Sequence, residues 1–171
     1  MGPRHCPPLE PTEMLSADLR KLLIAQIGSE LSAHQLYLAI AIYFERQSLD
    51  RWGKVFRHQS VEEAQHAQRI IDFLIDNEVE FDLPALKATS TRFGSPLEAV
   101  KRALESERTV AGQFDRAAEV ARTAGDHRGF EFLQWFIAEQ VEEETKIGHL
   151  VDLVDSGINL FQAEPLLDAY E

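Results

Sequence analysis

The sequence predicts an all-α protein: a four-helix bundle with one long crossover between its second and third helices and a short fifth helix at the carboxyl end. Four separate stretches repeat apolar residues at alternating spacings of three and four, the pattern of a helix that buries one face. Residues 79–94, between the second and third stretches, contain Pro, Gly, Thr and Ser and keep no period. One long irregular connection among short ones is typical of a bundle whose second and third helices run parallel.

The first two helices are separated by a connection of about two residues, which makes them an antiparallel hairpin. We expect the first helix to begin after Ser16 and to run to about Arg46. Ser48 is expected to cap the second helix, which then runs to about Asn77 or Glu78.

The third helix has the strongest start signal in the chain. Ser95 precedes a proline at the first helical position and Glu98 at the third, a capping box. The helix is expected to continue to about Ala124, with Gly125 as its carboxyl cap. Asp126 then opens a fourth helix, which forms a second hairpin with the third.

The fourth helix is expected to end near Asp155, before Gly157. A short fifth helix follows from Asn159, although Pro165 fits poorly inside it because proline cannot donate a helical hydrogen bond.

The long connection can span the whole bundle. A helix of about 29 residues is roughly 44 Å long, whereas an extended link of about 16 residues reaches roughly 53 Å. The predicted division is therefore a tail at residues 1–15, the bundle at 16–155, and a short helix with a tail at 156–171.

Composition limits the function classes. The net charge is −12, from 29 acidic against 17 basic residues, which argues against a nucleic-acid partner. The single cysteine, Cys6, excludes a disulfide framework and a cysteine-rich metal site. The sequence shows neither a signal peptide nor an apolar run of roughly 18–20 residues that could cross a membrane. We therefore expect a cytoplasmic protein with no membrane partner.

Each apolar stripe is interrupted near its centre by polar residues in core positions. These residues are Glu30, Glu63, His66, Glu107, Gln140 and Glu143. An unpaired buried carboxylate costs several kcal/mol, and no lysine or arginine occupies any of these positions. A bound metal is the simplest explanation. Oxygen ligands with a single imidazole favour iron or manganese, and two metals that share a bridging carboxylate would balance the charge.

A second acidic group borders this core. Glu62 adjoins Glu63, while Glu139 and Glu142 share a helix face with Glu143. A solvated acidic face is one reading, and we assign Glu144 to it. For Glu62, Glu139 and Glu142 we favour an additional cation site.

Two further residues of the first stripe have ordinary explanations. Tyr37 fits a core tyrosine with a satisfied hydroxyl, although a phenol beside a redox metal could also supply an electron. His34 is one turn from Glu30, and we favour a hydrogen-bonded core histidine over a metal ligand. Trp52, Trp135 and Phe136 are read as packing residues.

The chain resembles the bacterial non-haem ferritins. The resemblance rests on three stretches, at 28–37, 57–66 and 132–144, which read GSELSAHQLY, RHQSVEEAQH and FLQWFIAEQVEEE. Together with their order and spacing these motifs are highly specific, and the resemblance covers residues 16–155.

The resemblance implies a ferritin-like fold and three iron sites. Glu30, Glu63 and His66 would bind the first iron. Glu63, Glu107 and Glu143 would bind the second, with Gln140 adjacent and Tyr37 near the centre. The third, more exposed site would comprise Glu62, Glu139, Glu142 and Glu143.

Two differences from the bacterioferritins narrow the resemblance to the non-haem ferritins. Bacterioferritins carry a methionine haem ligand directly after the second-helix glutamate, where this chain has Ala64. Its only methionines are Met1 and Met14, so haem ligation of that type is not expected. Bacterioferritins and other di-iron carboxylate enzymes also have a second Glu-x-x-His, on the fourth helix. Here the residue three positions after Glu143 is Lys146, so that second histidine is missing.

By this resemblance the chain is expected to be a ferroxidase subunit of an iron-storage shell of about 24 chains. It would oxidise Fe(II) with dioxygen or hydrogen peroxide and pass Fe(III) to an interior mineral. Two alternatives remain open at the level of sequence: a di-iron oxidase or peroxide-detoxifying protein without storage, and a non-catalytic bundle that acts as an interaction module.

Overall fold

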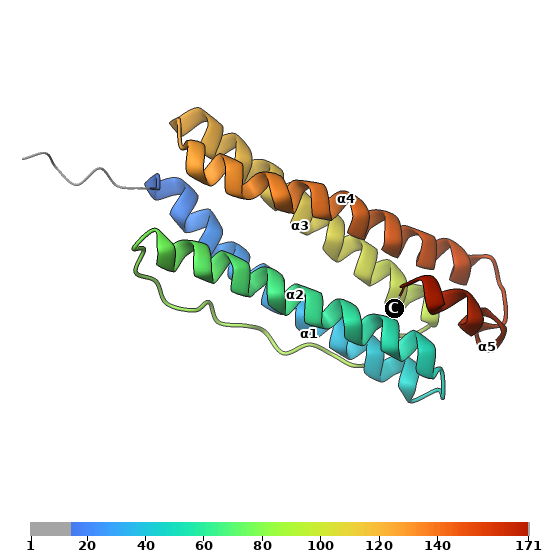
Figure 1. Ribbon diagram of the computed structural model, residues 1–171. Helices are drawn as coiled ribbons and strands as arrows, with labels where there is room; N and C mark the ends of the chain where they lie inside the picture. The colour runs from blue at the N-terminus through green and yellow to red at the C-terminus, as the bar shows by residue number, and fades with distance from the viewer. Residues whose placement is uncertain (1–14, 171) are drawn as a thin grey trace, which may run out of the picture.

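The chain folds into four long helices followed by two short ones, as the computed structural model of residues 15–170 shows (Figure 1). The long helices are α1 (Ala17–Glu45), α2 (Asp50–Asp76), α3 (Pro96–Ala124) and α4 (His127–Asp155). They are followed by α5 (Leu160–Ala163) and the 3₁₀ helix η1 (Glu164–Tyr170), and the described residues contain no strand. The predicted all-α bundle with a short fifth helix is confirmed. Cys6 and residues 1–14 of the predicted tail lie outside the described part of the chain.

Three of the four long helices begin with the side-chain caps that the sequence predicts. The hydroxyl of Ser16 accepts a hydrogen bond from the backbone N–H of Leu19 at 3.4 Å, and that of Ser95 accepts one from Glu98 at 3.1 Å. Asp126 accepts from the backbone N–H of Gly129 at 2.9 Å. These bonds satisfy N–H groups that the first turn of a helix leaves without a partner.

The predicted cap of the second helix is wrong. Ser48 lies in the turn with a left-handed φ of 59°, and Leu49 occupies the cap position without a side-chain hydrogen bond. Leu49 is buried in the apolar core at this end of the bundle. The start of this helix therefore depends on the burial of an apolar side chain, which no local capping pattern in the sequence indicates.

The connections establish the predicted topology. The α1–α2 and α3–α4 connections are short, and each pair packs as a hairpin. The crossover between Asp76 and Pro96 runs along the whole bundle in Figure 1, so that α2 and α3 are parallel. Pro84 of the crossover approaches α1 so closely that a Cβ atom added at Gly28 would lie 3.0 Å from its Cβ.

The core consists of two apolar clusters, and a polar layer lies between them. One cluster contains Tyr37, Phe44, Trp52 and Phe56 as its largest side chains, and the other contains Phe114 and Phe136. The candidate site lies between these two clusters.

The carboxyl-terminal segment packs on the bundle. Ala163 and Leu167 are buried in the first cluster, and the indole of Trp52 donates a hydrogen bond to the carbonyl of Leu160 at 3.1 Å. Helix α5 ends two residues before Pro165, where the chain continues as η1. No described helix combines the length and the apolar composition that a membrane-spanning helix requires.

Candidate metal centre

All four long helices contribute to the polar layer. Helix α1 supplies Glu30, α2 supplies Glu63 and His66, α3 supplies Glu107, and α4 supplies Gln140 and Glu143. None of these six residues is more than 4% exposed. The structure therefore brings together the whole set predicted for the inner site.

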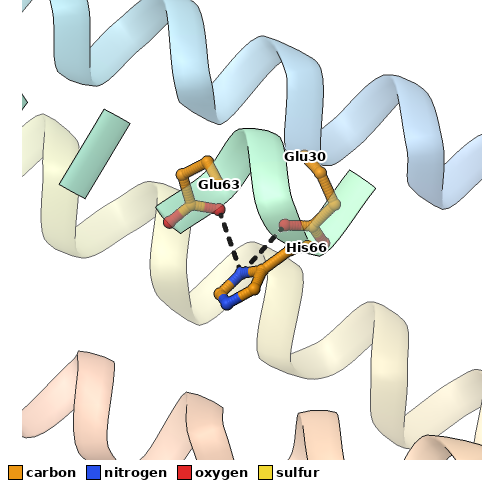
Figure 2. Close-up of side chains that lie close together, drawn as sticks. All are labelled: Glu30, Glu63 and His66. Carbon is orange, nitrogen blue, oxygen red and sulfur yellow. Dashed lines mark ion pairs between the residues drawn. The ribbon is translucent and has the colours of Figure 1, made fainter. Parts of the chain in front are cut away.

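The ring of His66 lies among three carboxylates. Its Nδ1 atom is 3.6 Å from Glu63 Oε2, 3.7 Å from Glu30 Oε2 and 3.9 Å from Glu143 Oε1. Figure 2 shows the carboxylates of Glu30 and Glu63 pointing toward the same edge of the ring. Trp135 and Phe136 contact the ring edge-on, with centroid distances of 5.5 and 5.9 Å, and so fix its orientation.

Two sets of potential ligands share one carboxylate. In the set Glu30, Glu63 and His66, one ligand atom from each residue lies within 4.8 Å of the others, and the same holds for Glu63, Glu107 and Glu143. Because Glu63 belongs to both sets, it is placed to bridge two cations. These are the two ligand sets that the resemblance implies.

Several buried polar atoms of the site have no hydrogen-bond partner within the described chain. They include both carboxylate oxygens of Glu63, one oxygen each of Glu30 and Glu107, and Nδ1 of His66. Each unsatisfied buried group of this kind costs about 1–3 kcal/mol, and a charged group costs more. These atoms belong to the two ligand sets, so bound cations would supply their missing partners. The side-chain oxygens of Gln59 and Gln140, beside the sets, also have no hydrogen-bond partner.

The remaining oxygens are held by neutral donors. Gln26 donates to Glu30 Oε1 at 2.7 Å, and the Tyr37 hydroxyl donates to Glu107 Oε1. Burial and the nearby Glu107 charge raise the pKa of Tyr37 well above its ordinary value, so Tyr37 remains a phenol donor. Each bond fixes one oxygen and leaves the other free for a cation.

Glu143 accepts two such bonds, from Gln59 at 3.0 Å and from Gln140 at 2.6 Å. Sequence reasoning did not assign a role to Gln59 or Gln26. The position of Gln59 in the buried stripe could have identified it, whereas Gln26 lies outside the stripe, one turn before Glu30.

Burial raises the pKa of three of the carboxyl groups. The pKa of Glu63 lies well above its ordinary value, first because of desolvation and then because of the Glu107 and Glu30 charges. Desolvation raises the pKa of Glu107 to about 7 and that of Glu143 to about 10. Burial alone would lower the pKa of His66, but the carboxylates of Glu30 and Glu143 raise it above its ordinary value. The metal-free site therefore holds protons that cations must displace.

Comparison with known proteins shows the family to which this four-helix bundle belongs. The family model described as the ferritin-like domain matches residues 20–156, most of the chain. The chain belongs to the ferritin family.

Individual relatives agree with this assignment. Ferritin BfrB of Mycolicibacterium smegmatis is 41% identical over 88% of this chain and 83% of its own length. A bacterial non-heme ferritin of Staphylococcus epidermidis is 35% identical over 91% of this chain and 96% of its own length. The solved structure of an open pore ferritin from the archaeon Archaeoglobus fulgidus superposes with a TM-score of 0.86 at 29% identity, covering 91% of this chain and 98% of that one.

In this ferritin-family chain, His34 lies outside the ligand sets. Its Nδ1 atom is 2.7 Å from the carbonyl oxygen of Ser60 and 2.9 Å from the Ser60 hydroxyl, which in turn donates to the His34 carbonyl at 3.0 Å. The geometry agrees with a hydrogen-bonded histidine that ties α1 to α2.

The residues predicted for the outer cation site are only partly brought together. Glu139 and Glu143 converge with His66, with one ligand atom from each within 4.8 Å of the others. Glu62 instead lies 3.3 Å from Lys146 Nζ and 3.6 Å from His58 Nδ1.

Glu142 is exposed. It shares a solvent-open pocket of about 590 Å³ with Glu62, Glu139 and Glu143, and Lys146 lines the same pocket.

Proposed function

We propose that the chain is a ferroxidase subunit of an iron-storage shell that oxidises Fe(II) at the buried carboxylate centre. The observation that carries this proposal is the pair of ligand sets that share Glu63, whose two oxygens are both buried and without a hydrogen-bond partner. Membership of the ferritin family supports the storage role.

The proposed reaction takes two Fe(II) ions as substrate. Glu30, Glu63 and His66 bind one ion, and Glu63, Glu107 and Glu143 bind the other, with Gln140 adjacent. Together the two ions give two electrons to dioxygen, which takes up two protons and leaves as hydrogen peroxide. When hydrogen peroxide is the oxidant, two electrons and two protons convert it to two waters.

The protein's contribution is to place the two ions side by side with hard oxygen ligands, which favour Fe(III). Tyr37, Gln26 and Gln140 hold the carboxylates in position, because each donates to an oxygen of the site. The Tyr37 phenol lies beside the site, where it is hydrogen-bonded to Glu107, so we also propose Tyr37 as a residue that can supply an electron to the oxidant.

The outer acidic residues are proposed as a third iron site and an exit toward an interior mineral. These residues are Glu62, Glu139, Glu142 and Glu143, and they line one pocket beside the inner centre. The chain is proposed to act in the cytoplasm, in a shell of about 24 copies. Haem is not part of the proposal, since Ala64 stands where bacterioferritins carry their methionine ligand.

Storage is tested by loading the metal-free protein aerobically with Fe(II) and following iron and protein together by gel filtration. We expect both to elute at roughly 24 times the 19.4 kDa mass of the chain. A parallel sample kept without oxidant should retain far less iron. Elution as a dimer, with the iron recovered in the small-molecule fraction, would instead identify a non-storage di-iron oxidase.

A further inference from the structure

Lys146 enters the outer acidic pocket from the helix that carries Glu143. It lies on α4, one turn after Glu143, and its ammonium reaches Glu62 of α2 at 3.3 Å. The two side chains are only 22% and 30% exposed. The contact is therefore a partly desolvated bridge between helices and not a loose surface ion pair.

Among the described residues that line this pocket, Lys146 is the one lysine or arginine. The other charged groups there are the carboxylates of Glu62, Glu139, Glu142 and Glu143, with the imidazoles of His58 and His149 beside them. A single ammonium thus supplies a positive charge to the cluster proposed to bind a third cation.

The lysine and a cation compete for the same acceptor. Glu62 Oε2 faces both Lys146 Nζ and, at 3.6 Å, His58 Nδ1. A divalent cation that binds this oxygen must displace the Lys146 ammonium. If the ammonium stays nearby, its positive charge repels the cation at short range. The pair itself adds little to folding stability, since partly exposed ion pairs are worth about 1 kcal/mol or less. Its main physical effect is on the charge of the pocket.

We propose that Lys146 competes with the third cation for Glu62, so that the subunit holds two cations tightly and the third only when the Lys146–Glu62 pair opens. This inference rests on the proposed function, because it presupposes two inner cations. In this proposal Lys146 determines how readily the outer pocket holds a cation, and its ammonium contacts Glu62 and not a residue of the two inner ligand sets.

The test measures Zn(II) binding to the assembled, metal-free protein by titration calorimetry. In the native protein we expect two tight ions per subunit and a weaker third. Lys146→Met should strengthen the third event about tenfold, the effect of removing one partly screened charge next to a divalent ion. Lys146→Arg keeps the charge and should bind like the native protein, and Lys101→Met removes an exposed lysine of α3 as a matched control.

Glu62→Gln completes a double-mutant cycle. It should weaken the third event in the native background and cancel most of the gain from Lys146→Met, because the two residues act through one contact. Equal third-site binding in the native, Lys146→Met and Lys146→Arg proteins, with two tight ions in each, would overturn the role of Lys146 alone. Absence of two tight ions from the native protein would overturn the proposed function as well.

Discussion

Glu63→Gln is expected to abolish rapid iron oxidation and, at the same time, to stabilise the metal-free protein. Glu63 belongs to both ligand sets, so its loss removes a ligand from each ion, and the initial rate of Fe(III) formation should fall at least about 100-fold. The glutamine has nearly the same volume and is neutral without taking up a proton, so the free energy of unfolding at neutral pH should rise by about 1–3 kcal/mol. The rate is followed by absorbance and the stability by denaturant unfolding.

The matched control is Glu105→Gln, which changes the same side chain at an exposed position of α3. It should leave both the rate and the stability within error of the native values. A native oxidation rate in the Glu63→Gln variant would refute the assignment of the site, whatever the change in stability.

Binding of two Zn(II) ions at pH 7 is expected to release roughly two protons per subunit. The pKa of Glu107 is about 7 and that of Glu143 about 10 in the metal-free site, and the pKa of Glu63 is also raised. Cations bind the ionised carboxylates, so these protons must leave. Calorimetry in two buffers with different ionisation enthalpies gives their number.

The same groups make the stability of the metal-free protein depend on pH. Each raised pKa contributes stability that is fully present below the ordinary carboxyl pKa and is lost as the pH rises through the value in the folded protein. Between pH 5 and 8 the free energy of unfolding should fall by about 1.4 kcal/mol per pH unit for each group that is still protonated in the folded protein, which is Glu107 up to about pH 7 and Glu143 over the whole interval. Stabilisation by Zn(II) should therefore grow over the same interval.

Glu107→Gln provides the control for both measurements. It removes the group that titrates near neutral pH, so it should reduce proton release and flatten the dependence of stability on pH. Proton release that is absent at pH 7 in the native protein would show that the buried carboxyls are not the groups that bind the ions.

The helices and the residues of the buried polar layer could be predicted from the sequence because both rest on local periodicity. A polar residue in an otherwise apolar stripe must face the core, and the topology then places Glu30, Glu63 and Glu107 at one level. Ser95, Asp126 and Gly125 act as predicted because their capping signals are local.

Features that depend on contacts between helices were not predictable in the same way. The helix start at Leu49 depends on burial in the core, and the ion pair of Glu62 with Lys146 joins residues that are 84 positions apart.

The most direct test of the central claim is anomalous X-ray diffraction, at the iron absorption edge, from crystals of the protein loaded anaerobically with Fe(II). Two strong peaks are expected inside each subunit, one among Glu30, Glu63 and His66 and the other among Glu63, Glu107 and Glu143. A bundle interior without iron, with peaks only on the surface, would contradict the assignment of the buried centre.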